Sequence, residues 1–434
     1  HPAIRPGGME LYALDLYEAL RESADFEPIF LARAGPPFGE PTGYHGPSPF
    51  TMVGNDPNQY LFYTNTFADH SSWDPLFGKW ANKQILSRFF RDFLLAQKPD
   101  IVHFQHFAHL GYEIVRVARN TLPGVPLVCS LHEYLAICHR DGQMVRTKGN
   151  ELCQNESPRR CHECFPEISP HTFFTRKRFI QSHLNLADLF VVPSEYAAER
   201  YSEWGIPRSK IVVKPYSRQP LSAEAEQFAP EQPNGVRNRF AFFGQLNPYK
   251  GADVLLEAME ILGHDFNGEL LVFGANLEIQ PPEFRERVQT LMNGKSQITF
   301  QGQYDRAELP KLMAGIDWVV VPSIWWETGP IVVWEAFQHG RPVICSDIGG
   351  MSEKVTDGLN GLHFRTGDPH DLAETMRRAA ETPGLWEELQ AGVPREPGHS
   401  IDEDVEIMTA IYKGLLERRE SMSPELSLEE AAHG

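Results

Sequence analysis

Short runs of apolar, β-branched residues alternate along the chain with longer stretches whose apolar positions recur at helical spacing. In the first half this pattern predicts strands at 100–105, 126–132, 188–193 and 211–215, with helices at 81–97 and 196–204. In the second half it predicts strands at 240–244, 269–274, 298–301, 318–322 and 342–346, with helices at 252–262, 283–292, 306–314 and 331–339. Strands joined by crossovers of this length predict an α/β protein whose parallel sheets are covered by helices on both faces.

A break in this pattern predicts two domains. Residues 219–238 are rich in Pro, Ala, Glu and Gln, have no apolar period and predict a linker. The linker separates a first Rossmann-like domain (1–218), with a cysteine-rich insertion at about 135–178, from a second one (239–400). A C-terminal helix is expected at 401–420, and the polar, acidic residues 421–434 predict a disordered tail. We expect the two domains to face each other across a cleft.

Composition narrows the classes of function. Of the 434 residues, 41% are hydrophobic and 23% charged, as in soluble globular proteins. The formal net charge of −18 argues against nucleic acid as a partner, because its binding depends on Lys and Arg contacts to phosphates. No apolar run approaches the roughly 20 residues that a transmembrane helix needs. We expect a cytoplasmic protein.

The start of the second domain has the chemistry of a phosphate site. Residues 242–253 read as a strand end, a loop with Gly and Pro, Lys250 and the first turn of a helix. Free N–H groups and the positive dipole end at a helix N-terminus favour a phosphate group, and a nearby lysine adds a full charge. An ordinary turn with a solvated lysine is the alternative.

Two carboxylates, eight residues apart, follow a later strand. Glu327 lies in the loop after the strand at 318–322, and Glu335 lies inside the apolar helix at 331–339. Because an unpaired buried carboxylate is costly, a hydroxyl pair, N–H groups or a cation is expected to satisfy Glu335. A structural carboxylate that caps a neighbouring loop is the alternative.

These two segments together resemble the family 4 glycosyltransferases, which are retaining, nucleotide-sugar-dependent enzymes with the GT-B fold. Glu327 and Glu335 meet the E-x7-E signature, and residues 244–251 meet the family's Gly-x-Leu-x3-Lys-Gly loop. Residues 340–361 resemble the family's segment after the second glutamate, and Gly7-Gly8 resembles its N-terminal Gly-Gly loop.

The resemblance implies a role for each matching donor-binding position. Lys250 would bind the donor diphosphate, helped by backbone N–H groups of Gly7 and Gly8. The N–H groups of Ile331 and Val332 would lie near the donor sugar and the β-phosphate.

The resemblance also implies roles for the two carboxylates. Glu335 would accept hydrogen bonds from the ribose hydroxyls, and Glu327 would act beside the donor sugar as a catalytic residue. Gln245 departs from the pattern, because the family usually has an arginine there. Either another basic residue replaces this cation of the donor site, or donor affinity is lower.

Two other features depart from the family's pattern. The loop after Glu327 reads Thr-Gly-Pro, a variant associated with polysaccharide-assembly members of the family. Only six residues precede Gly7, so the strand expected before it is absent or truncated, and a longer parent sequence is expected.

Histidines gather at two predicted strand ends of the first domain. His103, His106 and His109 lie at and after one strand, and His132 follows the next. Ligands bind at the carboxyl ends of parallel strands. The first three histidines span a change from strand to loop, so a catalytic metal is disfavoured. The resemblance makes His106 and His132 candidate catalytic residues that contact the sugar or the acceptor, and structural histidines are the alternative for His103 and His109.

Four of the six cysteines fall in one segment, at Cys138, Cys153, Cys161 and Cys164. The C-x2-C pair at its end and the expected reducing compartment favour a structural zinc site. Free or redox-active thiols and disulfides are the alternatives. No cofactor is expected for catalysis.

The expected reaction is sugar transfer from a UDP or GDP sugar to a glycan or lipid-linked acceptor, in surface polysaccharide or glycoconjugate assembly. A non-catalytic nucleotide-sugar or glycan-binding module and a GT-B sugar-nucleotide epimerase are the alternatives. A basic segment with Arg176, Lys177 and Arg178 predicts attraction of an anionic acceptor through peripheral contact at a membrane face, with an ordinary solvated surface as the alternative.

Overall fold

The computed structural model describes residues 7–34, 48–63, 80–108, 110–218, 235–394 and 398–422. The chain forms two units. The first comprises His1–Pro193, Ala198–Ser217 and Ser400–Gly434, and the second comprises Ser194–Ala197 and Arg218–His399. The last helix that the structure describes therefore belongs to the first unit, although the whole second unit precedes it in the sequence.

The second unit is built on a six-stranded parallel sheet with the order β11-β10-β9-β12-β13-β14. Its strands are β9 (Arg239–Gln245), β10 (Glu269–Ala275), β11 (Ile298–Gly302), β12 (Trp318–Val321), β13 (Val343–Ser346) and β14 (Gly361–Phe364). All four residues of β12 and of β13 are buried, as expected of strands covered on both faces. The order reverses between β9 and β12, and ligands of such sheets bind at the carboxyl ends of strands at this switch point.

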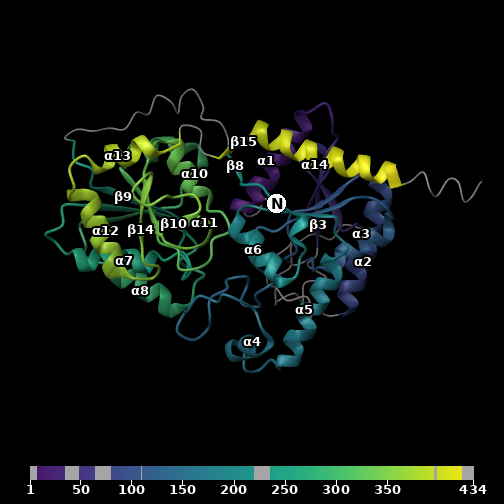
Figure 1. Cartoon of the computed structure of the whole chain (residues 1–434), viewed down its shortest axis with the longest axis horizontal. Coiled ribbons are helices and arrows are strands. Elements are labelled where there is room, and N and C mark those ends of the chain that lie inside the picture. Colours follow the sequence, from purple (N-terminus) through teal and green to yellow (C-terminus); the bar gives the residue numbers. More distant parts are fainter. Residues whose placement is uncertain are drawn as a thin grey trace, which may run out of the picture. The chain divides into compact units, whose positions relative to one another are not determined.

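Helices cover both faces of this sheet, each over its own apolar core. Figure 1 shows α7, α8 and α12 on one side of the strands and α10 and α11 on the other. The first face is covered by α7 (Ala252–Leu262), α8 (Pro282–Met292), α12 (Pro369–Glu381) and α13 (Leu385–Gly392), and the second by α9 (Leu309–Ala314), α10 (Ile331–Gln338) and α11 (Gly349–Ser352).

The first unit contains a four-stranded parallel sheet with the order β4-β5-β6-β7 and a separate three-stranded sheet with the order β1-β3-β2. The strands of these two sheets are β1 (Phe30–Ala34), β2 (Phe50–Val53), β3 (Asp56–Tyr63), β4 (Val102–Phe104), β5 (Leu127–Ser130), β6 (Leu189–Val192) and β7 (Ile211–Val213). Its helices are α1 (Gly8–Glu22), α2 (Trp80–Gln97), α3 (Glu113–Thr121), α4 (Pro158–Cys164), α5 (Pro170–Leu184), α6 (Glu195–Trp204) and α14 (Ile401–Met422). The short strands β8 (Ser217–Arg218) and β15 (His399–Ser400) pair with each other.

The structure confirms the α/β class and the parallel sheets, and every strand predicted above is present within two residues at each end. Gly7 caps α1 and Gly8 is its first residue, so the two glycines lie at a helix start, and their contact with a donor diphosphate stays a prediction. Two expectations need correction. The helix predicted at 306–314 begins as a 3-10 turn, and α14 runs on to Met422, into the predicted tail.

Some expectations concern residues outside the described part. They are His109, most of the predicted linker (219–234), the start of the chain (1–6) and the rest of the tail (423–434). None of the helices in the described ranges is long and apolar enough to cross a membrane.

Candidate functional site

Two loops meet at the switch point of the second unit, one after β9 and one after β12. The N–H of Ile324 donates to the carbonyl of Tyr249 at 2.9 Å, which joins the loops. Gly251, directly after Lys250, has φ of +68°, and a Cβ added there would lie 1.9 Å from the carbonyl oxygen of Pro322. Only glycine fits this close approach, so the Lys-Gly sequence places Lys250 directly beside the second loop.

Glu327 is the centre of this site. Its Oε1 accepts hydrogen bonds from Lys250 Nζ at 2.6 Å, Ser323 Oγ at 2.8 Å and Trp325 Nε1 at 2.8 Å. The side chain is buried, and burial opposes its charge, but the Lys250 ammonium and the hydrogen bonds outweigh that cost and keep the pKa of Glu327 below its usual value. The site therefore holds a charged carboxylate and a cation in direct contact.

A third loop, which follows β13, closes on the same residues. The N–H of Gly350 donates to the carbonyl of Glu327 at 2.8 Å, and Gly349 has φ of +58°. A Cβ added at Gly350 would lie 2.7 Å from the carbonyl oxygen of Thr328. The two glycines thus allow the backbones of the two loops to touch. This backbone contact fixes the position of Glu327.

Glu335 lies in α10 and differs from Glu327 in its surroundings. The side chain is half-buried, and none of the described residues donates a hydrogen bond to its carboxylate. Burial raises the pKa of Glu335, and the charge of Arg306 opposes that rise. Because α10 starts after Pro330 without a side-chain cap, the N–H groups of Ile331 and Val332 have no acceptor within the helix. A carboxylate without a donor among the described residues, and N–H groups without an acceptor inside the helix, thus lie on one short helix.

Gln245 ends β9 and is exposed. As an uncharged amide it contributes no cation to this site. Sequence reasoning missed Ser323 and Trp325 as partners of Glu327, although both lie within four residues of it, because a loop sequence does not show which side chains turn toward one carboxylate.

The first unit has a separate network of polar side chains at the ends of β4 and β5. His132 Nδ1 accepts from the hydroxyl of Tyr216 at 2.8 Å, and His132 Nε2 donates to Gln105 Oε1 at 3.1 Å. His103 bonds to Ser130 Oγ at 2.8 Å and to the hydroxyl of Tyr412 of α14 at 2.6 Å. Burial lowers the pKa of His103 to about 3 and that of His132 well below its usual value, so both rings are neutral near pH 7.

His106 lies beside Glu133, with 3.6 Å between Nε2 and Oε1, and its Nδ1 accepts from the N–H of Ala108 at 2.9 Å. Burial lowers the pKa of His106 to about 4 and raises that of Glu133 to about 7. The structure thus brings His103, His106 and His132 to one edge of the sheet as predicted. Contact of His106 and His132 with a sugar or acceptor stays a prediction.

Two known protein families match this chain. The family described as Glycosyltransferase Family 4 matches residues 6–215, and the family described as Glycosyl transferases group 1 matches residues 223–392. The chain belongs to these glycosyltransferase families. The two matches meet where the described fold passes from the first unit to the second, and they confirm the resemblance read from the sequence motifs.

Individual relatives of this family member are distant. A D-inositol 3-phosphate glycosyltransferase from Nocardioides is 26% identical over 323 residues, which cover 68% of this chain and 62% of that protein. The chain thus matches less than two thirds of that relative's length. Sucrose-phosphate synthase of Thermosynechococcus elongatus has a TM-score of 0.68 at 18% identity, with 95% of this chain and 94% of that one covered. HepE of Anabaena, solved with UDP and glucose, has a TM-score of 0.60 at 17% identity, with 94% and 96% covered. These two structures confirm the GT-B fold class.

The cysteine-rich segment of this family member holds free thiols. All six cysteines are free, so the disulfide alternative is not realised. Burial raises the pKa of Cys138 to about 11 and that of Cys161 to about 12. Within the described ranges, no three His, Cys, Asp or Glu side chains are placed to hold a metal ion. Zinc at Cys138, Cys153, Cys161 and Cys164 stays a prediction.

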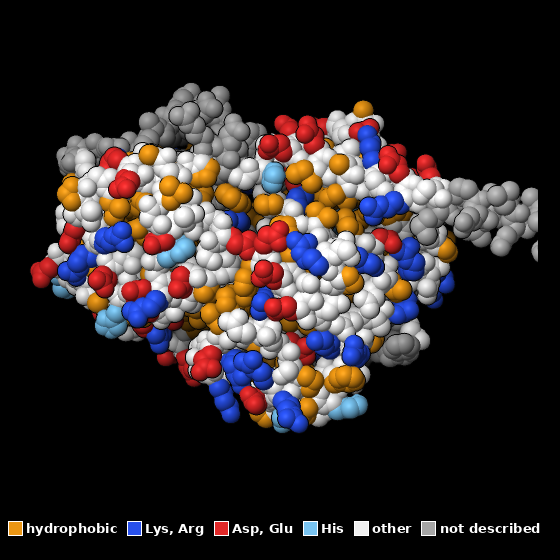
Figure 2. All heavy atoms as spheres, in the orientation of Figure 1, with side chains coloured by type: hydrophobic (Ala, Val, Ile, Leu, Met, Phe, Trp, Pro, Cys, Tyr) orange, Lys and Arg blue, Asp and Glu red, His pale blue; other side chains and the backbone are white. Residues whose placement is uncertain are grey.

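The expected basic surface is not present as predicted. Arg176 is only 4% exposed, and its guanidinium donates to the carbonyls of Leu135 at 2.7 Å and Ala136 at 3.0 Å. Lys177 Nζ lies 3.0 Å from Oε2 of Glu156. In Figure 2, basic side chains over the region of α4 and α5 are mixed with acidic and apolar ones. Arg176 is a structural residue that holds the insertion, because buried carbonyl groups need donors.

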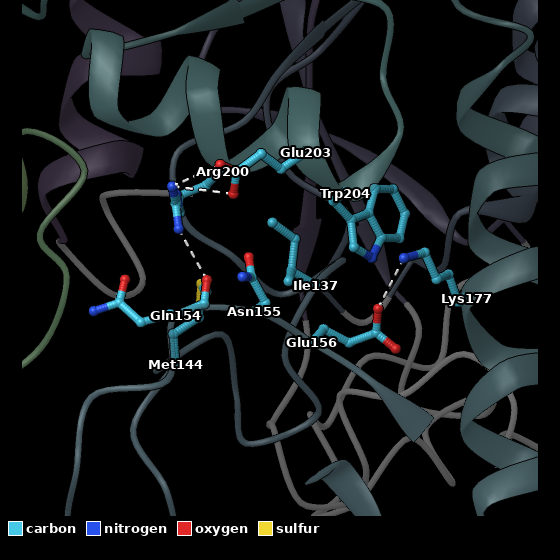
Figure 3. A pocket seen from close by; sticks show the side chains of 9 residues that line it. All are labelled: Ile137, Met144, Gln154, Asn155, Glu156, Lys177, Arg200, Glu203 and Trp204. Carbon is cyan, nitrogen blue, oxygen red and sulfur yellow. Dashed lines mark hydrogen bonds and ion pairs between the residues drawn. The ribbon is translucent and has the colours of Figure 1, made fainter. Parts of the chain in front are cut away.

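Glu156 and Lys177 also line a small pocket of about 110 Å³ in the first unit (Figure 3). Its remaining lining residues are Ile137, Met144, Gln154, Asn155, Arg200, Glu203 and Trp204. Arg200 donates to the carbonyl of Gln154 at 2.9 Å and to Glu203 at 3.1 Å, so these contacts tie α6 to the insertion. The pocket is separate in sequence from the loops that carry Glu327.

Proposed function

We propose that the chain is a retaining glycosyltransferase that moves a sugar from a nucleoside diphosphate donor to a glycan or lipid-linked acceptor. The observation that supports this best is the convergence of three loops on the Lys250–Glu327 pair at the switch point of the second unit. Cytoplasmic location, peripheral contact with a membrane and a role in surface polysaccharide assembly belong to the same proposal.

The residues of the second unit suit the two ends of a nucleotide sugar. The half-buried carboxylate of Glu335 lacks a donor among the described residues, and a pair of ribose hydroxyls would supply two. Lys250 and the free N–H groups at the start of α10 suit the diphosphate. These groups are positioned before any ligand arrives, and such preorganised dipoles stabilise charge that develops in a transition state.

In the proposed reaction, the bond between the anomeric carbon and the diphosphate oxygen breaks while positive charge develops at the sugar. A bond then forms from that carbon to the acceptor hydroxyl oxygen, and the hydroxyl proton leaves with the nucleoside diphosphate. Lys250 stabilises the departing diphosphate, and Glu327 stabilises the positive sugar. We propose that no metal ion takes part, so that EDTA leaves the transfer rate unchanged.

The test is a panel of UDP, GDP and ADP sugars with the full chain. A ligand that binds only the native state raises the melting temperature by mass action, so thermal shifts identify the donor. UDP sugars come first, because HepE was solved with UDP and glucose. Release of the nucleotide together with sugar incorporation into an acceptor supports the proposal. Binding without turnover in the presence of acceptors supports the binding module, and nucleotide release that needs no acceptor and yields an epimerised sugar supports the epimerase.

A further inference from the structure

Lys354 is a buried lysine whose ammonium has no hydrogen-bond partner in the described part of the chain. The residue is 9% exposed, and its Nζ is buried without an acceptor. Its described contact is with the ring of Trp334, whose centroid lies 4.9 Å from Nζ. Buried lysines are almost always paired, since an unpaired buried charge is costly. An unpaired one therefore requires an explanation.

The charges around Lys354 belong to the candidate site. The carboxylates that act on it are Glu327 and Glu353, but Oε1 of Glu327 is already held by Lys250, Ser323 and Trp325. Glu353 accepts hydrogen bonds from backbone N–H groups instead. Burial lowers the pKa of Lys354 to about 7, and the two carboxylates oppose this fall. The charge of the carboxylate that Lys250 contacts thus also acts on this amine, which has no hydrogen-bond partner of its own among the described residues.

The backbone fixes Lys354 in this position. It follows α11, in the loop after β13 whose Gly350 donates to the carbonyl of Glu327. The N–H of Lys354 itself donates to the carbonyl of Met351 at 3.0 Å. Gln245, at the end of β9, brings no charge. Lys250 contacts Glu327 directly, and Lys354 is a further lysine under the influence of that carboxylate, without an ion-pair partner among the described residues.

We infer that Lys354 is a second cationic residue of the nucleotide site, whose ammonium binds a phosphate oxygen of a nucleoside diphosphate. The inference rests on the proposed function. The bound anion supplies the partner that the amine lacks, because charge-assisted hydrogen bonds to phosphate are among the strong ones. It also explains why a costly unpaired charge is kept in the free protein: the cost is recovered when the ligand binds.

The first test is Lys354→Met, which keeps the length of the side chain and removes its charge. We expect the Kd for UDP, measured by calorimetry with the full chain, to rise about 10- to 100-fold, as for loss of one charged hydrogen bond. The affinity for uridine, which has no phosphate, is expected to stay the same. Lys311→Met is the matched control, because Lys311 is an exposed lysine of the same unit, and its UDP affinity should equal that of the unaltered chain.

The outcomes separate the inference from the proposed function. If the unaltered chain binds UDP and Lys354→Met binds it equally well, the inference is wrong and the proposed function stands. If the unaltered chain binds none of the nucleoside diphosphates, the proposed function fails and the inference fails with it. A parallel loss of uridine and UDP affinity means that Lys354 acts through the fold, which also overturns the inference.

Discussion

Lys250 Nζ and Glu327 Oε1 lie 2.6 Å apart, although 77 residues separate them in the chain. The cation that we propose for the diphosphate is therefore already in contact with a carboxylate before any ligand binds. A nucleotide has to compete with Glu327 for this cation. The charge of Glu327 should therefore lower the affinity for the nucleotide while it raises the rate of sugar transfer.

The substitution Glu327→Gln is expected to separate the effect on nucleotide affinity from the effect on the rate of transfer. The amide keeps the shape of the side chain and removes the negative charge, so UDP affinity should stay the same or rise up to about ten-fold. Sugar transfer should fall about 10²- to 10³-fold, the usual cost of losing one preorganised electrostatic group. Calorimetry and single-turnover kinetics measure the two effects. A parallel fall in both would assign Glu327 to nucleotide binding instead.

Glu335→Ala is expected to weaken nucleotide binding, because it removes the acceptor proposed for the ribose hydroxyls. The cost should be roughly 1.5–3 kcal/mol, as for a hydrogen bond to a charged group. The sharper comparison is UDP against dideoxy-UDP, which lacks both hydroxyls: the unaltered chain should prefer UDP, and Glu335→Ala should not. Glu286→Ala, at an exposed glutamate of α8, is the control and should keep the preference.

Lys354 predicts a stability effect with a definite sign. Its pKa is about 7 in the folded protein and is lowered by burial, so between about pH 7 and 10.5 the unfolded chain binds more protons than the folded one. The free energy of unfolding should therefore rise with pH across this window. Lys354→Met lacks the buried charge, so it should be more stable than the unaltered chain at pH 6, and the difference should shrink by pH 9. Denaturant titrations at both pH values check this, and a pH-independent difference would contradict it.

The pair formed by Lys214 and Asp404 predicts how α14 is held. Both side chains are almost fully buried, and Lys214 Nζ also bonds to the hydroxyl of Tyr12 at 2.7 Å. Asp404→Ala should destabilise the first unit by about 3–5 kcal/mol, because it leaves Lys214 buried without its counter-ion.

The control for this prediction lies on the same helix. Lys413 of α14 pairs with Asp25 at 2.9 Å, but both side chains are about half exposed. Lys413→Met should therefore cost less than about 1 kcal/mol. Equal effects of the two substitutions in denaturant melts would refute a special role for the buried pair.

Zinc at the four cysteines is decided by metal analysis of the purified chain. The hypothesis predicts about one zinc per chain and loss of stability when a chelator removes it. Cys161→Ser should then destabilise the insertion and leave nucleotide binding intact. Metal-free protein of native stability, with four thiols that react freely with an alkylating reagent, would leave the free-thiol alternative.

The fold was largely predictable because its strands are short apolar runs buried on both faces. The three-stranded sheet of β1, β2 and β3 was missed, since its strands are mostly half-buried and give no continuous apolar run. The loops of the site were found from their motifs, but the Lys250–Glu327 contact was not. Such a contact depends on which loops the strand order brings together, and a local pattern does not contain that information.

Charge counting along the sequence failed for Arg176 for a related reason. Three consecutive basic residues look like a solvated face, yet helix geometry turns one of them inward, where the carbonyls of the insertion need donors. Lys354 went unnoticed because a lysine beside a glutamate is ordinarily on the surface. Burial, which changes the chemistry of both residues, is visible only in the folded chain.

The place of α14 has a consequence for synthesis on the ribosome. Lys214 is made 190 residues before Asp404, an interval of about 10 to 40 s at roughly 5–20 residues per second. Throughout that time the nascent first unit contains a lysine whose counter-ion does not yet exist, whereas the last strand of the second unit's sheet, β14, is complete before Asp404 is made. The half of the protein that is translated first should therefore mature last, and a stalled or truncated chain should expose an incomplete N-terminal half to chaperones and proteases.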